Sequence, residues 1–139
     1  MSDLIHITND ILEVEKIVSL VSHPELGGIS VFIGAVRNRT QGKNVVRLEY
    51  EAYEPMAVAE MTRICNRLKE QWSDARVAIH HRVGILTVGE AAVVIAVATP
   101  HRDHAFAACK FAIDTLKETV PIWKKEVFED GEVWVAAHP

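Results

Sequence analysis

Hydrophobic positions recur along the first half of the chain at two spacings, a spacing of two residues that is typical of strands and one of three to four that is typical of helices. The spacing of two predicts strands over 4–8, 28–38 and 45–53, and the polar, Gly-containing segment between the last two predicts a hairpin. The longer spacing predicts a helix over 9–23 with Asn9 as its N-cap. Its apolar face is expected to comprise Ile11, Val14, Ile17, Val18 and Val21.

Two longer helices are predicted in the second half of the chain. The first begins near Pro55, a residue type that suits the first turn of a helix, and the second runs over 101–118. Both are amphipathic and should pack on a sheet. The inward positions of the first are Ala57, Met61, Ile64, Cys65, Leu68 and Trp72. Those of the second are Ala105, Phe106, Cys109, Ala112, Ile113 and Leu116, with Asp103, Lys110, Asp114 and Lys117 on its other stripe.

Further strands are predicted around these helices. Segment 76–90 is strand-like, and segment 91–100 is so uniformly apolar that it should be a central strand covered on both faces. Segments 122–128 and 132–137 flank an Asp-Gly pair, which is a hairpin signal. The order βαββαββαββ mixes hairpins with helices, so the sequence predicts an α+β fold with a C-terminal hairpin, in one domain over residues 1–139.

Charge and composition restrict the expected partners and location. The net charge is −4, which does not favour nucleic acid or an anionic membrane as a partner. The N-terminus carries early acidic residues and lacks the features of a secretory signal, and no apolar run approaches the ~20 residues of a membrane span. A cytoplasmic protein is therefore expected, and any anionic ligand must be held by a local cluster of cations.

Several familiar site patterns are missing from the sequence. It has no Gly-rich phosphate loop after a strand, no C-x-x-C, no H-E-x-x-H and no G-x-S-x-G elbow. His80 and His81 are sequential on a predicted strand and so point to opposite faces, which makes them a poor metal pair. Cys65 and Cys109 each fall on an apolar helical stripe, which favours buried free thiols over a disulfide or a nucleophile.

Cations gather instead at the ends of the predicted elements. They are Arg37, Arg39, His101, Arg102, Lys117, Lys124 and Lys125. Each also has an ordinary explanation, because hairpin loops, helix surfaces, helix C-termini and strand edges often carry solvated cations. His101 and Arg102 gain from their context, since a helix N-terminus after a buried strand offers free N–H groups to an anion.

The two lysines of the segment "PIWKKE" must face opposite sides of their strand. Trp123 and Val127 share the face of Lys125, and this apolar pair is expected to point to the core. Lys124 would then lie on the face that solvent or a ligand contacts. At most one of the two lysines can enter a site directly.

Five segments together resemble a known family. They are "FIGAVRN", "LEYEAYEPMA", "HHRVGILTVGE", "ATPHRDHAF" and "LKETVPIWKKE". In this order, from about Gly28 to Trp134, they are similar to the large, catalytic subunit of molybdopterin synthase. The resemblance implies an alpha/beta hammerhead-like fold with a mixed, mostly antiparallel sheet and three helices.

The resemblance also implies site residues by position. Lys117 and Lys124 match the two catalytic lysines of the family, and Arg37 matches the arginine of its V-R-N segment. His101 and Arg102 match its pterin-phosphate pocket, which completes a substrate-binding set with Arg37 and the two lysines. Lys125 has no counterpart. Where some relatives carry an arginine near the C-terminus, this chain has His138, which departs from the family pattern and leaves anion binding from that end open.

The reaction implied by the resemblance is sulfur transfer to cyclic pyranopterin monophosphate (precursor Z), which makes the dithiolene of molybdopterin in molybdenum cofactor biosynthesis. The sulfur donor is a thiocarboxylate on the Gly-Gly C-terminus of a small ubiquitin-like partner subunit. No metal or organic cofactor is required. The implied assembly is a homodimer of large subunits with one small subunit at each end, a heterotetramer.

Two other classes of function remain open from the residues. A binding module would dock a ubiquitin-like tail without turnover, using the C-terminal hairpin as an edge for strand addition. A small acyl-thioester hydrolase would need a carboxylate base in the cleft, for which Asp103 and Glu118 are the candidates.

Overall fold

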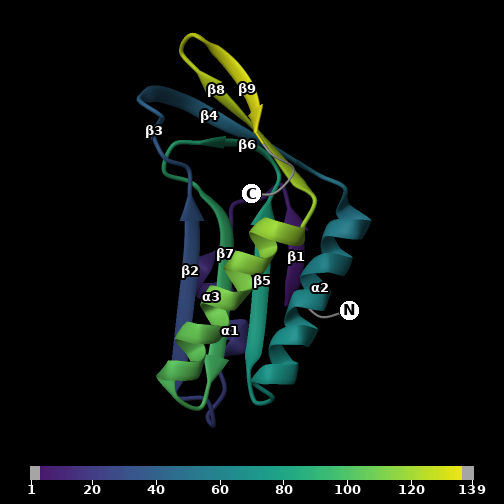
Figure 1. Cartoon of the computed structure of the whole chain (residues 1–139). Coiled ribbons are helices and arrows are strands. Elements are labelled where there is room, and N and C mark those ends of the chain that lie inside the picture. The colour runs from purple at the N-terminus through teal and green to yellow at the C-terminus, as the bar shows by residue number, and fades with distance from the viewer. Residues whose placement is uncertain (1–3, 136–139) are drawn as a thin grey trace.

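The computed structural model describes residues 4–135, which form nine strands and three helices (Figure 1). The strands are β1 (Ile5–Thr8), β2 (Gly28–Ala35), β3 (Arg39–Thr40), β4 (Lys43–Ala52), β5 (Arg76–Arg82), β6 (Gly84–Thr87), β7 (Ala91–Thr99), β8 (Ile122–Phe128) and β9 (Gly131–Val135). The helices are α1 (Val14–Val21), α2 (Glu54–Gln71) and α3 (Arg102–Thr119). The α+β class predicted from the sequence is confirmed.

The strands form two sheets that meet at one end of the molecule. The first sheet has the order β1-β5-β7-β2 and is antiparallel except for the parallel pair β1 and β5. The second has the order β3-β4-β8-β9, with β6 also paired to β4. Figure 1 shows α2 and α3 side by side along the first sheet and the second sheet beyond the C-terminal end of α3. This arrangement leaves the α3–β8 turn at the junction of the two sheets.

Strand β7 is the centre of the fold. Residues 92–99 are all buried, because α3 packs on one face of the strand and α1 on the other. The prediction of a central strand covered on both faces is therefore confirmed. The smaller of two apolar clusters lies under α1 and contains Leu12, Ile17, Val21, Ala78, Val94, Ala96 and Ala98.

Truncation of the central strand should be costly. Ile95 of β7 is fully buried in the main core, so Ile95→Ala should lower the free energy of unfolding by about 2–5 kcal/mol through lost burial and a cavity. Val88→Ala, at an exposed position in the β6–β7 turn, should change it by no more than about 0.5 kcal/mol. Urea unfolding of both variants measures the difference, and similar losses in the two would contradict this view of the core.

The first helix starts later than predicted. Its N-cap is Glu13 rather than Asn9, and Ile11, which was expected on the apolar face, is 70% exposed. The backbone N–H of Asp10 donates to the hydroxyl of Thr8 at 3.0 Å. This local turn competes with helix formation over 9–12, which explains the error.

The predicted hairpin over 28–38 and 45–53 was also wrong. Strand β2 pairs with β7 in the first sheet, whereas β4 belongs to the second sheet and pairs with the two-residue strand β3. Segment 76–90 likewise divides between β5 in one sheet and β6 in the other. Gly84 has a φ of +95°, a conformation that other residues rarely adopt. This conformation lets the chain pass from the first sheet to the second.

The long helices largely follow the predicted stripes. On α3 the exception is Phe106, which was expected to point inward and is 61% exposed. It follows the buried Ala105 by one position, so the helical rotation turns it away from the sheet.

Cys65 and Cys109 are both free, as predicted, and burial raises the pKa of Cys65 to about 11. None of the helices in the described part of the chain is long and apolar enough to span a bilayer.

Candidate active site

Two lysines lie on either side of the turn between α3 and β8. Lys117 lies exposed in the last turn of α3, and Lys124 is the third residue of β8. Between them, the N–H of Val120 donates to the carbonyl of Leu116 at 3.1 Å, and the N–H of Ile122 donates to that of Val120 at 2.9 Å. Leu116, Val120 and Ile122 are fully buried, so the turn is anchored in the core while the two lysines flank it.

The faces of β8 differ from the prediction. Ile122 and Glu126, which share the face of Lys124, are both buried, whereas Trp123 is 38% exposed. Trp123 was therefore wrongly expected to point to the core, although Val127 on the same face is buried. Ile122 joins the main apolar cluster, and this fixes the orientation of the strand. Lys124 consequently lies partly buried on the face that contains Ile122.

Lys125 occupies the other face of β8 and has a structural partner there. Its Nζ lies 3.4 Å from Oε1 of Glu49, the residue opposite it on β4. Glu49 also accepts a hydrogen bond from Nε of Arg47 at 3.0 Å, and this bond contributes most to lowering the pKa of Glu49. The charge of Lys125 is thus paired with that of Glu49 within the second sheet. This agrees with the lack of a counterpart of Lys125 in the family motif.

A buried polar group lies beside Lys124. Tyr50 is opposite Lys124 in the β4–β8 register, and its ring packs against the edge of His81 with the centroids 5.2 Å apart. Burial, followed by the charge of Glu126, raises the pKa of Tyr50 to about 12. Burial also lowers the pKa of His81 to about 4, and its Nδ1–H donates to the carbonyl of Arg82 at 2.6 Å. Near neutral pH, Tyr50 is therefore protonated and His81 is uncharged.

Tyr50 and His81 were not predicted from the sequence as neighbours of Lys124. The alternation in β4 does put Tyr50 on the same face as Leu48, and that signal predicts a buried side chain. The pairing of β4 with β8 joins positions far apart in the chain and has no local signal. Burial of Tyr50 was thus readable from the sequence, whereas its position opposite Lys124 was not.

Arg37 lies at the same end of the first sheet as the lysines. It is the second residue after the end of β2. Its neighbours are held by backbone hydrogen bonds, since the N–H of Val36 donates to the carbonyl of Glu90 and the carbonyl of Asn38 accepts from the N–H of Val45. The side chain of Arg37 is exposed. Within residues 4–135 it forms no ion pair, so its charge is available to an anion.

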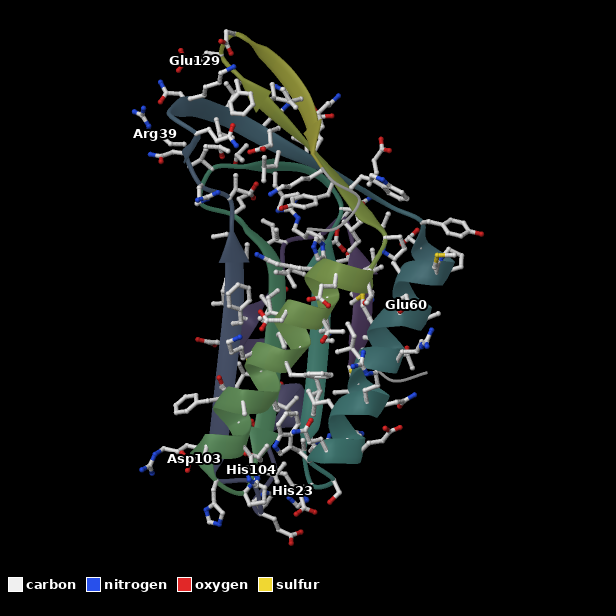
Figure 2. All side chains as sticks on the ribbon, in the orientation of Figure 1. His23, Arg39, Glu60, Asp103, His104 and Glu129 are labelled. Carbon is white, nitrogen blue, oxygen red and sulfur yellow. The ribbon has the colours of Figure 1, made fainter. Side chains whose placement is uncertain are left out.

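His101 and Arg102 lie at the opposite end of the molecule. Helix α3 is continuous from Arg102 to Thr119, and the fifteen positions from Arg102 to Lys117 span about 22 Å at 1.5 Å per residue. Figure 2 shows Asp103 and His104, which follow Arg102, at the end remote from Arg39 and Glu129 on the second sheet. One chain therefore brings Arg37, Lys117 and Lys124 to one end, and not His101 or Arg102.

The His101 end has its own concave surface. A cavity of about 360 Å³ opens between the C-terminus of α2 and the N-terminus of α3. Its lining includes Trp72, Asp74, Thr99, His101 and His104. His138, at the other terminus that the sequence singled out, lies outside the described residues.

Comparison with known proteins places the chain among established relatives. The family model described as MoaE protein matches residues 7–119, a range that includes Arg37, His101, Arg102 and Lys117 and ends before Lys124. The molybdopterin synthase catalytic subunit of Bacillus subtilis is 53% identical over 129 residues, which cover 93% of this chain and 82% of the relative.

Solved structures agree with the sequence relatives. The crystal structure of molybdopterin synthase from Staphylococcus aureus matches with a TM-score of 0.91 at 40% identity, covering 94% of this chain and 95% of the other. A protein–protein complex of subunit 1 and 2 of molybdopterin-converting factor from Helicobacter pylori matches with a TM-score of 0.78 at 18% identity, covering 98% and 94%, which is a likeness of fold. The resemblance found in the sequence is confirmed: the chain belongs to the MoaE protein family, that of the molybdopterin synthase catalytic subunits.

Proposed function

We propose that this chain transfers sulfur from the C-terminal thiocarboxylate of a small ubiquitin-like subunit to cyclic pyranopterin monophosphate, forming the dithiolene of molybdopterin. One observation carries the proposal. Lys117 and Lys124 flank a buried turn, and neither forms an ion pair with a carboxylate in the described part of the chain. Two uncompensated ammonium groups beside a junction of sheets suit an anionic tail and an anionic substrate.

The local chemistry assigns a role to each cation. Lys117 would bind the thiocarboxylate end and move protons, and Lys124 would contact the substrate and the charge that develops on it. Opening of the cyclic phosphate creates negative charge, which lysine and arginine groups stabilise most strongly in a site that excludes water. Arg37 would bind the phosphate. The reaction in this form needs no metal or organic cofactor, and its expected location in the cytoplasm stays a prediction.

His101 and Arg102 would enter the site from a second copy of the chain. Strand β2 is an edge of the first sheet, and its Ile29, Val31 and Ile33 are 42%, 38% and 46% exposed because α1 does not cover them. Two β2 strands aligned antiparallel about a two-fold axis would bury this stripe. The start of each strand, which contacts the backbone of Arg102, would then lie beside the other copy's Arg37.

This geometry supports a homodimer with two equivalent sites, each completed by a small subunit at one end of a heterotetramer. A hydrolase is less well supported, because Asp103 lies at the end remote from the lysines and leaves only Glu118 of the two proposed bases. A docking module would use the same lysines without turnover.

A single incubation separates these functions. The purified chain is mixed with the thiocarboxylated partner and cyclic pyranopterin monophosphate, and pterin and partner are followed by mass spectrometry. Sulfur transfer predicts a dithiolene product. Binding without a product would indicate a docking module, and conversion of the tail to a carboxylate without a dithiolene would indicate a hydrolase.

Substrate anchoring gives a further prediction. Arg102→Ala should weaken pyranopterin binding about tenfold or more, because a hydrogen bond from a guanidinium to a phosphate is lost, and should affect binding of the small partner less. Arg63→Ala removes an exposed arginine of α2 that pairs with Glu60, and should leave both affinities unchanged. Calorimetric titration of each ligand decides the matter. Equal pterin affinity in Arg102→Ala and the wild type would remove Arg102 from the pocket.

A further inference from the structure

The carboxylate of Glu90 is held by three hydrogen bonds at the start of β7. Its Oε1 accepts from the backbone N–H of Thr87 at 2.7 Å and from the hydroxyl of Thr87 at 3.0 Å. Its Oε2 accepts from Nη1 of Arg82 at 3.2 Å. Both carboxylate oxygens are thus engaged, and the β6–β7 turn is closed by the side chain of Glu90.

Arg82 depends on this carboxylate. The residue is 8% exposed, and its Nε has no hydrogen-bond partner among the described residues. A buried guanidinium without a counter-ion is strongly unfavourable, so the ion pair with Glu90 ties the end of β5 to the start of β7. Between these two points β6 leaves the first sheet to pair with β4. The ion pair therefore joins the two points at which the chain leaves the first sheet before β6 and returns to it after β6.

The same turn holds the residue before Arg37. The N–H of Val36 donates to the carbonyl of Glu90 at 3.0 Å, and the N–H of Gly89 donates to the carbonyl of Val36 at 2.9 Å. The β2–β7 register shifts between Gly34 and Ala35, so the regular ladder has been interrupted before Val36. These two bonds to the turn consequently fix the backbone from which Arg37 projects.

We propose that the Arg82–Glu90 ion pair is a positioning device for Arg37 in the substrate site. The pair fixes the β6–β7 turn, the turn fixes both backbone groups of Val36, and Val36 fixes the origin of the Arg37 side chain. Arg37 has no ion pair of its own within residues 4–135, so the backbone at Val36 and Arg37 sets the point from which its side chain reaches a phosphate. The inference rests on the proposed function for its link to substrate, and not for its link to Val36.

The test removes the charge of Glu90 with little change of shape. Glu90→Gln keeps an amide oxygen for Thr87 and loses the ion pair. The Michaelis constant for cyclic pyranopterin monophosphate should rise about tenfold while kcat changes much less, because misplacement of a binding group weakens substrate anchoring. The paired change Arg82→Met with Glu90→Gln leaves no unpaired buried charge and should give the same rise. Glu60→Gln, which removes the partner of Arg63 on α2, should give none.

A double-mutant cycle shows whether the effect passes through Arg37. In an Arg37→Ala background, Glu90→Gln should raise the Michaelis constant no further, because the group that it positions is gone. An equal rise in both backgrounds, or no rise in the wild-type background, would overturn the proposal.

Amide exchange provides a readout that does not need turnover. The N–H of Val36 should exchange about tenfold faster in Glu90→Gln than in the wild type, while the N–H of Val97 in the centre of β7 should not change. If the wild type makes no product, the proposed function fails while the exchange rates still decide whether the pair holds Val36. Unchanged exchange at Val36 would overturn the positioning role.

Discussion

Replacement of Lys117 by alanine is expected to abolish sulfur transfer and to leave the fold intact. The side chain is exposed in the last turn of α3 and forms no ion pair within the described residues, so its loss creates no cavity and breaks no structural contact. The free energy of unfolding should change by no more than about 0.5 kcal/mol. Dithiolene formation by the reconstituted complex and urea unfolding of the variant measure the two effects.

The two lysines of β8 provide the matched comparison. Lys124→Ala should lose most activity, because Lys124 lies on the face of Ile122 near Tyr50, whereas Lys125→Ala should keep most of it, because Lys125 pairs with Glu49 on the other face. Wild-type turnover by Lys117→Ala would remove that residue from the catalytic centre. A loss in Lys125→Ala as large as that in Lys124→Ala would mean that the outer face of the strand takes part.

Mixing Lys117→Ala with Arg102→Ala is expected to restore activity at a pterin concentration too low to fill the weakened Arg102→Ala site. If Lys117 and Arg102 of one site come from different copies, a mixed dimer of Lys117→Ala and Arg102→Ala chains contains one site with both residues intact. Random pairing should then recover about a quarter of wild-type activity, since half the dimers are mixed and each has one good site of two. Product formation after the two variants are mixed and allowed to exchange measures the recovery.

The structure narrows what a negative result would mean. Helix α3 is unbroken between Arg102 and Lys117, so a bend that brings the two residues together within one chain is excluded in this conformation. If mixed dimers are shown to form and no activity returns, Arg102 does not belong to the site of Lys117. Lys117→Ala mixed with Lys124→Ala is the control, and it should recover none, because both residues come from the same copy.

The sequence predicted the elements whose signal is local. Strand β7 is apolar along its length, and α3 has a regular stripe, so both were predicted close to their observed bounds. The sequence also put His101 and Arg102 at a helix N-terminus, where the structure has them. The separation of Arg102 from Lys117 follows from the rise of a helix, because the helix predicted over 101–118 contains both residues.

The errors concern pairings between distant segments. The departure of β6 into the second sheet depends on its pairing with β4, and only Gly84 marks it in the sequence. The face of β8 was misjudged because apolar residues lie on both sides of the strand. Trp123 is the larger, yet Ile122 is the one that the buried turn after α3 carries into the core.

The most direct test of the central claim follows the sulfur atoms themselves. The small partner is prepared with a heavy-isotope thiocarboxylate and incubated with this chain and cyclic pyranopterin monophosphate, and the pterin is analysed by mass spectrometry. The account predicts a dithiolene in which both sulfur atoms are heavy, formed by the wild type and not by Lys117→Ala. A dithiolene without the label, or a tail hydrolysed to a carboxylate while the pterin stays unchanged, would contradict it.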